Sequence, residues 1–588
     1  MLAAFVSSCT GSRDPWGDID PWGGEGGGQE QQDPQGGETE EDEGETETDV
    51  DIDDSDTSDD NIANTSFDNV VSVVYSQEGV SVSGLVTGID AQQEGARLTL
   101  TNTTDRKVKY VLSGQSSDGF FKLYSSKKQA IVLSGLTLTN TQGAAINNQS
   151  KKRTFVVIEG ENSLSDGNLN ASGDYPEQTA DEDMKAAFFS EGQLVFSGSG
   201  SLTVNAVGKS GITSDDYVRF MNGSDVTVKS SNGHGVRGKD AVIVSGGTVR
   251  VTLSSTATGK KCFTTDSLMY IEGGTSVLVN QASAGSVDGE LTGAACIKAD
   301  QLFVIQGGEL SATASGKGCK GISGDQKGYF EGGKVTVKAS GANYGSSSGR
   351  YYSASDNSVS SKAIKFDGSL VFSGADVTAS ASSHEAIESK GTVTVSGGTI
   401  SATSSDDAVN SASTMTISGG VIYAYSTGND GLDANGNMTI SGGTVYAIGC
   451  GSPEVAIDAN TEGGYRLYIK GGNVIAVGGL ESNSSVSLAQ VSTSWTKNAS
   501  YSLCDGDSVL FSFKAPAKGG SGLYMLSPTL VSGQSYALKT SATLSGATSY
   551  FDGVLSLGGS ATGGTSSTLK AAAYSSGGGG GSHGPGRW

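Results

Sequence analysis

Apolar and polar residues alternate within one short sequence motif, here called the phrase, which occurs four times between residues 393 and 477. The first copy reads Val393-Thr-Val-Ser-Gly-Gly-Thr-Ile-Ser-Ala, and its first glycine recurs at 419, 442 and 471, after gaps of 22, 23 and 29 residues. Alternation on both sides of Gly-Gly predicts two short strands that meet at a corner. Glycine suits this corner because it accepts a positive φ and leaves room for a neighbouring backbone. A repeat of this length is typical of a solenoid.

Looser copies of the phrase extend the pattern upstream as far as Gly135. With the first glycine of a copy as position zero, apolar residues recur at −10, −4, −2, +3 and +5, as in Ile387, Val393, Val395, Ile400 and Ala402. Five such positions per turn fill one continuous core, and three strands per coil, stacked roughly 4.8 Å apart, make a parallel β-helix. A β-sandwich would turn more often and without this fixed register. We therefore predict an all-β fold, a parallel β-helix of about ten or more coils with β caps and disordered tails.

Composition divides the chain into six predicted parts. Strand-like segments begin near Phe67, the repeated phrase ends near Gly479, and the last residues are rich in glycine and serine. We predict a lipoprotein signal remnant over 1–9, an acidic disordered tether over 10–62, an N-terminal β cap over 63–129, the parallel β-helix over 130–479, a C-terminal β cap over 480–557 and a Gly/Ser-rich disordered tail over 558–588.

The negative charge of the chain is concentrated near its start. The formal net charge is −25, and the stretch from Asp14 to Asp60 holds 20 acidic and no basic residues, which leaves about −5 for the rest. Such a tract cannot bury enough apolar surface to fold, and its self-repulsion extends it. The remainder lacks a net positive field, so we expect no nucleic-acid partner. No apolar run approaches the length of a membrane span.

The cysteines indicate an anchor and packing positions. Residues 1–8 close with small residues directly before Cys9, as at the end of a bacterial lipoprotein signal. We therefore predict that Cys9 is lipidated and that the protein lies at the bacterial cell surface or outer membrane. Chance is the alternative, because the apolar run is short. Cys262 and Cys296 both stand at position −11 of neighbouring coils, where we expect packing residues and keep a disulfide as the alternative.

Stacked coils turn each position of the repeat into a column along the solenoid. At −9 and −12 the middle coils carry cations and the last coils carry carboxylates, and we call these two sets the basic stripe and the acidic stripe. The basic stripe consists of His234, Arg237, Lys261, Lys298, Lys320, Lys362 and Lys365, and the acidic stripe consists of Glu388, Asp407, Asn410, Asp430, Asp433 and Asp458.

The acidic stripe predicts a calcium site. Carboxylates one coil apart repel each other by roughly 1 kcal/mol in water and by more where water is excluded. Calcium removes that cost and takes six to eight oxygen ligands, which carboxylates and an amide supply. The alternative is a solvated acidic face without an ion.

The basic stripe predicts a partner of opposite charge. Lysine and arginine side chains spaced along a groove suit the carboxylates of uronic-acid polysaccharides, and arginine can bind a carboxylate with two hydrogen bonds. Charge balance with nearby aspartates is the alternative. Tyr423, Tyr425 and Tyr446 replace serine and threonine on the last coils, where their rings can stack on sugars. Alternatively, the C-terminal cap covers this patch.

Three segments resemble a family of bacterial surface proteins described as carbohydrate-binding domain-containing. They are the run from Met184 to Val204, Lys209-Ser-Gly-Ile-Thr-Ser-Asp-Asp and Gly233-His-Gly-Val-Arg-Gly-Lys-Asp, and Ser527-Pro-Thr-Leu-Val-Ser-Gly-Gln-Ser-Tyr is similar too. The resemblance covers residues 65–545. It implies a right-handed parallel β-helix akin to polysaccharide lyases, binding of cellulose-like or acidic polysaccharides, and bound calcium, with no established catalysis.

The function that we predict is calcium-assisted, non-catalytic binding of polysaccharide, acidic glycans or cellulose, by a lipid-anchored monomer. A calcium-dependent lyase is one alternative, because Lys362, Lys365 and His384 stand beside Glu385 and Glu388 and a lyase needs a base next to an acidic metal cluster. A surface adhesin or structural stalk is the other, and it leaves the basic stripe unexplained.

Overall fold

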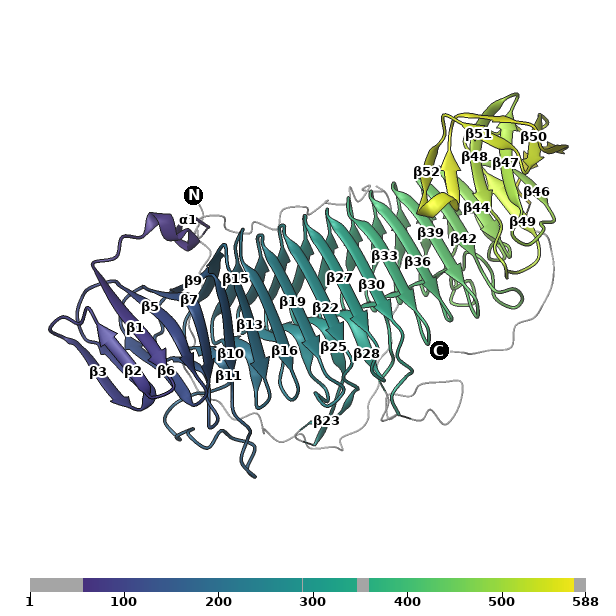
Figure 1. Ribbon diagram of the computed structural model, residues 1–588. Coiled ribbons are helices and arrows are strands. Elements are labelled where there is room, and N and C mark those ends of the chain that lie inside the picture. Colours follow the sequence, from purple (N-terminus) through teal and green to yellow (C-terminus); the bar gives the residue numbers. More distant parts are fainter. Residues whose placement is uncertain (1–56, 288, 346–358, 576–588) are drawn as a thin grey trace, which may run out of the picture. The chain divides into compact units, whose positions relative to one another are not determined.

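Parallel strands dominate the structure, a computed structural model that describes residues 57–575 except 288 and 346–358. The residues from Thr57 onward form one compact unit. The repeated coils build a β-solenoid of about 15 turns. Figure 1 shows their strands lying side by side from the purple to the green part of the chain. This confirms the predicted fold class.

Each regular coil contributes three short strands. In one coil they are β34 (Ile387–Ser389), β35 (Val393–Val395) and β36 (Thr399–Ser404). Each pairs in parallel with its equivalent in the next coil, namely β37 (Val409–Ser411), β38 (Met415–Ile417) and β39 (Val421–Ser426). The five apolar positions of this coil are at most 3% exposed, so they fill the core as the register predicts.

The first strand of each coil belongs to one separate sheet, which is parallel apart from the β3–β4 pair. It contains 14 strands, one from each coil in chain order after the first hairpin. They are β3 (Ile89–Glu94), β4 (Ala96–Asn102), β6 (Gly119–Ser125), β8 (Ile146–Asn148), β11 (Ala186–Ser190), β14 (Ser210–Ser214), β17 (Val236–Gly238), β20 (Lys261–Thr265), β25 (Ala294–Ala299), β28 (Cys319–Gly324), β31 (Ile364–Phe366), β34, β37 and β40 (Leu432–Ala434).

The two glycines of each Gly-Gly corner are required for different structural reasons. A Cβ on the first glycine of a pair would collide with a carbonyl oxygen of the previous coil, for example at Gly442, where the distance to the Ser418 oxygen would be 2.1 Å. The second glycine has a φ between 73° and 78° in the four best copies, for example at Gly443. The corner therefore needs glycine first for close approach and then for its left-handed backbone.

Parallel stacking begins earlier in the chain than we predicted. β1 (Asn69–Ser76) pairs in parallel with β5 (Val108–Ser116), and β4 pairs in parallel with β6, all before residue 130. Only β2 (Gly79–Ser83) and β3 pair antiparallel, with β1 and β4 respectively. The segment that we predicted as a separate cap thus contributes coils, because its strands alternate in the same way as those that follow.

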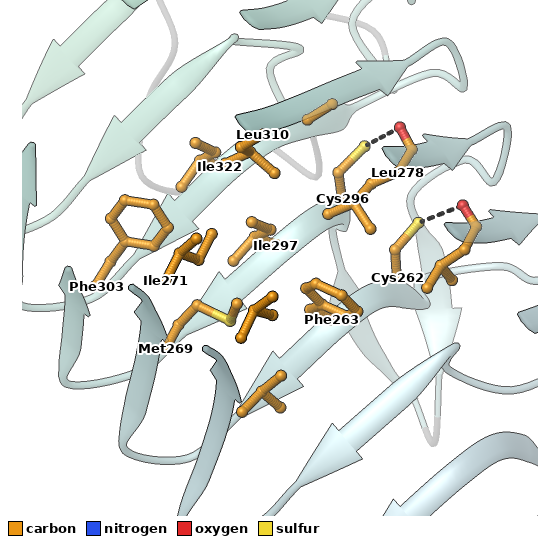
Figure 2. Packing of buried hydrophobic residues seen from close by; sticks show 14 of the residues in the cluster. Cys262, Phe263, Met269, Ile271, Leu278, Cys296, Ile297, Phe303, Leu310 and Ile322 are labelled. Atoms are coloured by element: carbon orange, nitrogen blue, oxygen red, sulfur yellow. Dashed lines mark hydrogen bonds between the residues drawn. The ribbon is translucent and has the colours of Figure 1, made fainter. Parts of the chain in front are cut away.

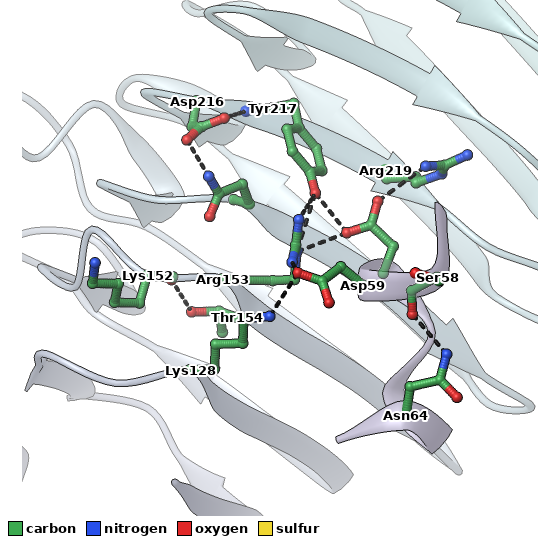
Figure 3. Close-up of polar contacts among 12 residues, drawn as sticks. Ser58, Asp59, Asn64, Lys128, Lys152, Arg153, Thr154, Asp216, Tyr217 and Arg219 are labelled. Carbon is green, nitrogen blue, oxygen red and sulfur yellow. Dashed lines mark hydrogen bonds and ion pairs between the residues drawn. The ribbon is translucent and has the colours of Figure 1, made fainter. Parts of the chain in front are cut away.

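The end of the predicted tether docks on the solenoid. Helix α1 (Thr57–Asp60) is followed by the short helix η2 (Ile62–Asn64), and Asp60 is 2% exposed. Its carboxylate lies 2.7 Å from Arg153 Nε and 3.0 Å from Arg219 Nη1, and Tyr217 donates a hydrogen bond to it. Figure 3 shows Arg153, Tyr217 and Arg219 gathered beside this helix. The predicted disorder is therefore wrong for residues 57–62, because ion pairs with the solenoid order them, and composition does not reveal such pairing.

An antiparallel sheet of eight strands lies in the C-terminal part. It contains β47 (Ser500–Asp505), β48 (Ser508–Lys514), β50 (Ser535–Thr540), β51 (Thr543–Ser545), β52 (Thr548–Tyr550), β53 (Leu555–Leu557), β54 (Ser560–Thr562) and β55 (Thr565–Lys570). All six residues of β55 pair with β50. Residues 558–570 therefore contain two strands, β54 and β55, and are not the disordered tail that we predicted, because backbone hydrogen bonds hold a polar, exposed edge strand there.

The buried cysteines are packing residues. Cys262 and Cys296 are free thiols with no exposed surface, and Cys296 lies 3.9 Å from the carbonyl oxygen of Leu278. In Figure 2 both sulfurs lie among apolar side chains such as Phe263 and Ile297. The structure thus has the packing arrangement and not the disulfide. Cys9 falls outside the described residues.

Candidate functional site

The 14-stranded sheet carries the predicted −9 column in register. Its strand pairings place Arg237 beside Thr264, Thr264 beside Lys298, Lys298 beside Ser323, Ser323 beside Lys365, Lys365 beside Glu388, Glu388 beside Asn410 and Asn410 beside Asp433. Lys261, Ala295 and Lys320 of the −12 column are neighbours in the same way. The two stripes therefore share one face of one sheet, as the repeat predicts.

All three cations of the −9 column are already paired with carboxylates. Arg237 Nη2 lies 2.8 Å from Asp266 Oδ2, Lys298 Nζ lies 3.1 Å from Asp300 Oδ1, and Lys365 contacts Asp367. These aspartates stand at position −7, two residues after the cations' own column. The column of aspartates at 266, 300, 325 and 367 is a sequence signal for pairing that we did not use. For these three cations the structure has the charge balance that we kept as the alternative.

Lys261 and Lys320 differ from the paired cations. Both are half-buried, and neither forms an ion pair with any residue that the structure describes. Burial, together with the charges of Lys260 and Lys298, lowers the pKa of Lys261 to about 8. Burial, together with Lys365 and Lys362, lowers the pKa of Lys320 to about 8 as well. Two positive charges thus stand two coils apart on this face, and within the described part of the chain their carboxylate neighbours act on them only from outside ion-pair distance.

His234 lies at the start of this pair. Its Nδ1 accepts a hydrogen bond of 3.1 Å from the backbone N–H of Lys261. Burial and the charges of Lys261, Lys260 and Arg237 hold the pKa of His234 well below its ordinary value. The imidazole is therefore neutral, and it reports the positive field that surrounds it.

The basic and acidic stripes meet in a compact ionic cluster. Lys362 Nζ lies 3.1 Å from Glu385 and also contacts Glu388, which Lys390 pairs from the other side. Burial opposes its charged form, but Glu385 and Glu388 raise the pKa of Lys362. Burial likewise opposes the charge of Glu385, yet Lys362 and His384 lower its pKa to about 2. Glu388, which we assigned to calcium, is neutralised here by two lysines.

His384 adds a possible metal-binding group to this junction. Its Nδ1 contacts Glu385 and lies 3.2 Å from Asp406 Oδ2. Ligand atoms of these three residues lie within 4.8 Å of one another. From the sequence we assigned Asp406 no role. Asp406 stands directly before the −12 aspartate Asp407, and this Asp-Asp pair is the signal that could have shown it.

The acidic stripe is a buried row of like charges. Asn410 Nδ2 donates hydrogen bonds of 2.7 Å to Asp433 and 3.3 Å to Asp407, and Asp407 Oδ1 accepts one from the backbone N–H of Asp430. Asp407 and Asp430 are each 5% exposed. Burial and then the neighbouring carboxylates raise the pKa of both well above the ordinary value, and they raise that of Asp433 to about 7.

Asp458 continues the acidic stripe one coil further. Its Oδ1 is buried without a hydrogen-bond partner, and burial together with a hydrogen bond to Glu481 raises its pKa to about 11. Oxygen donors of this type, with one of them orphaned, fit a hard cation such as calcium. The acidic stripe is an extended row of side chains and not a compact cluster. Among the described residues, two compact groups of three metal-ligating side chains occur, and both lie outside this stripe, at His384–Glu385–Asp406 and at Asp183–Glu191–Asp215.

The tyrosine patch is covered by the C-terminal sheet. Tyr446 has no exposed surface, and its hydroxyl donates a hydrogen bond to the carbonyl of Lys514. The ring of Tyr423 contacts that of Phe551 in a tilted arrangement with a centroid separation of 5.8 Å, and Tyr425 packs against the same cluster. In Figure 1 the yellow C-terminal strands lie beside β39 and β42 (Thr444–Ile448). A glycan cannot reach Tyr446, so the structure corrects that assignment.

Fold and site together define a β-solenoid protein with rows of charged side chains along one sheet. The family described as carbohydrate-binding domain-containing protein matches residues 94–425, more than half of the chain. The chain belongs to this family, as the resemblance predicted. No helix in the described part of the chain has the length and apolar character that crossing a membrane requires.

Other comparisons add little. No curated protein matches the sequence. Among solved structures, the chain is similar to one described as the polysaccharide lyase-like protein from C. thermocellum in a gadolinium derivative, with 17% identity and a TM-score of 0.28. The match covers 52% of this chain and 93% of that chain. At this TM-score the likeness supports no conclusion about fold or function.

Proposed function

We propose that the protein binds acidic polysaccharides along the basic stripe. The observation that carries this proposal is the pair Lys261 and Lys320, two half-buried cations without an ion-pair partner among the described residues, on the face that the stacked coils form. An unpaired buried cation is costly, and a carboxylate of a ligand removes that cost. Stacking sets the two lysines two coils apart, roughly 10 Å, with the small Ala295 between them.

We further propose that calcium assists this binding at the acidic stripe. Asp407, Asp430, Asp433 and Asp458 with Asn410 would hold the ion, which would neutralise their mutual repulsion and attract ligand carboxylates. The orphaned Oδ1 of Asp458 supports a cation at this end. Glu388 is excluded from this ligand set, because its oxygens pair with Lys362 and Lys390.

A binding assay with matched variants tests the function. Wild-type protein is titrated with a galacturonate hexamer by calorimetry, with calcium and with a chelator. The double variant Lys261→Met and Lys320→Met should lose at least about tenfold in affinity, because each hydrogen bond to a charged group contributes about 1.5–3 kcal/mol. Lys338→Met, on an exposed position of another face, is the control. Unchanged affinity in the double variant contradicts the proposal.

The same samples separate the alternatives. A lyase that is given polygalacturonate in the presence of calcium releases an unsaturated product, which is detected by its ultraviolet absorbance. Lys362, one base considered for that reaction, has a raised pKa and is therefore a poor proton acceptor. An adhesin or stalk would bind no glycan in any condition.

We also propose that the protein acts as a lipid-anchored monomer at the bacterial surface. The support is the residue pattern before Cys9 and the acidic tract that follows it. Metabolic labelling with a fatty-acid analogue tests this, since the Cys9→Ala variant should lose both the label and its membrane fraction. Equal labelling of both forms contradicts it.

A further inference from the structure

A polar groove lies at the N-terminal end of the 14-stranded sheet, on the face that carries the basic stripe. Its volume is about 940 Å³, and strands β3, β4 and β6 form its floor. The −9 column continues into it, because Gln92 pairs with Thr99, Thr99 with Lys122, and Lys122 with Asn147 of β8. We call it the amide groove.

Ionic contacts fix the walls of the amide groove. Arg97 Nη2 lies 2.7 Å from Asp118 Oδ1, and Arg97 Nη1 contacts Glu177 of the long loop after β10 (Glu161–Ser165). Thr141 donates a hydrogen bond of 2.8 Å to Asp118. These contacts tie the loop to the floor, so the groove exists before any ligand arrives.

The cations of the amide groove are not available to an anion. Arg97 is held by two carboxylates, and Lys122 Nζ lies 2.8 Å from Glu182 Oε2. Four carboxylates but only these two cations line the groove within the described part of the chain. An acidic polysaccharide would therefore be repelled here, in contrast to the stripe around Lys261 and Lys320.

The remaining lining suits hydroxyl groups. Gln77, Gln92, Gln93, Gln142 and Thr99 line the groove, and the Oε1 of Gln77 already accepts a hydrogen bond of 3.0 Å from the Ser117 hydroxyl. An amide offers both donors and an acceptor, which is the combination that a sugar hydroxyl needs. Phe120 is half-buried on the same floor, and its ring, which Arg97 Cζ covers on one side at 5.8 Å from the centroid, adds apolar surface for a sugar ring.

We propose that the amide groove binds a neutral oligosaccharide, as a second glycan site distinct from the basic stripe. The inference rests on the carbohydrate binding proposed above, but on other residues and another ligand charge. One chain would then hold an uncharged and an acidic polysaccharide at the same time, on one face of one sheet.

Calorimetry with cellohexaose, laminarihexaose and mannohexaose tests the second site. At least one of these neutral hexamers should bind, and the double variant Gln92→Ala and Gln142→Ala should lose about tenfold in affinity for it, since each hydrogen bond contributes about 0.5–1.5 kcal/mol. Gln534→Ala, an exposed glutamine outside the groove, is the matched control. Circular dichroism verifies that the variants remain folded.

Ligand charge separates the two proposals. The glutamine variant should keep its affinity for the galacturonate hexamer, and the lysine variant should keep its affinity for the neutral hexamer. Binding of the acidic hexamer alone overturns the amide groove and leaves the stripe intact. If the glutamine variant binds the neutral hexamer as tightly as wild-type protein does, the amide-groove proposal is also overturned. If wild-type protein binds neither hexamer, both proposals are overturned.

Discussion

At the scale of single residues, the two stripes differ in how their charges are satisfied. The −9 cations find aspartates of the −7 column, whereas Lys261 and Lys320 stand without an ion-pair partner among the described residues. The aspartates of the acidic stripe are buried beside each other, and an amide is their main donor. Unpaired charge of both signs is costly in isolation, so each stripe is suited to a ligand of the opposite sign.

The pH dependence of glycan binding follows from the two lysines. Because the pKa of each is about 8, both are charged at pH 6 to 7 and lose their protons as the pH rises through about 8. Affinity for the galacturonate hexamer should therefore be constant below about pH 7 and fall at higher pH, with a midpoint at or above 8 because the bound anion favours the charged form. Calorimetry from pH 6 to 10 measures this. A flat profile contradicts the assignment.

Asp433→Asn should have opposite effects with and without calcium. Without the ion, loss of one charge relieves repulsion on Asp407 and Asp430, so the melting temperature should rise. With calcium, affinity for the ion should fall by about tenfold or more, since even partners outside the coordination shell contribute that much. Differential scanning fluorimetry across calcium concentrations measures both. Asp367→Asn, whose partner is Lys365, is the control and should leave the calcium response unchanged.

At the scale of elements, the corner of each coil is the least tolerant feature. Gly443 has a φ of 73°, and a Cβ there would lie 2.6 Å from the carbonyl oxygen of Gly419. The backbone of one coil thus packs directly on the backbone of the next. Side chains at these corners would push neighbouring coils apart and break the register that aligns the stripes.

Gly443→Ala should therefore destabilise more than a substitution at a left-handed glycine in open space. The left-handed conformation alone costs a non-glycine residue about 1–3 kcal/mol, and displacement of the next coil adds to that. Gly464→Ala is the matched control, because its φ is 86° and a Cβ there would have no neighbour within 4 Å among the described residues. Chemical denaturation compares the two. Equal losses of stability would show that the close approach contributes nothing.

Helix α1 is too short to be stable by itself and is held in place by ion pairs. Its four residues are too few to be stable alone, and Asp60 joins them to Arg153 and Arg219. Asp60→Asn should release this segment locally, with about tenfold or faster proteolysis near residue 57, because hydrogen bonds to charged groups contribute about 1.5–3 kcal/mol. Limited proteolysis with mass spectrometry detects the cut. Asp59→Asn, which removes more exposed pairs, should have a smaller effect.

At the scale of the whole molecule, translational repetition made most of the fold predictable. Ile387, Val393 and Val395 recur at fixed distances from a glycine, and parallel hydrogen bonding then requires that Lys298, Lys365 and Asn410 share a face. The amide groove could not be predicted in this way. It depends on a loop that carries Glu177 back to Arg97, and contacts between remote residues leave no periodic signal.

Ionic strength should separate the two glycan sites of the intact protein. Attraction between exposed charges is screened beyond about 10 Å at 0.1 M salt. Affinity for the galacturonate hexamer should thus fall several-fold between about 0.05 M and about 0.5 M salt, while affinity for the neutral hexamer stays within about twofold. Calorimetry at both salt concentrations measures this. An equal decrease for both ligands would indicate a single shared site.

Reversal of strand direction at both ends has a consequence for self-association. β44 (Asn473–Val477) pairs in parallel with β42 on one side and antiparallel with β49 (Leu523–Leu526) on the other. At the opposite end, β2 and β3 also run against the strands beside them. A second copy would meet strands of reversed direction at β2, β3 and β49, so its parallel coils would find no matching partner at those three strands. Such reversed strands act against growth into fibres, the hazard that every open stack of identical strands carries.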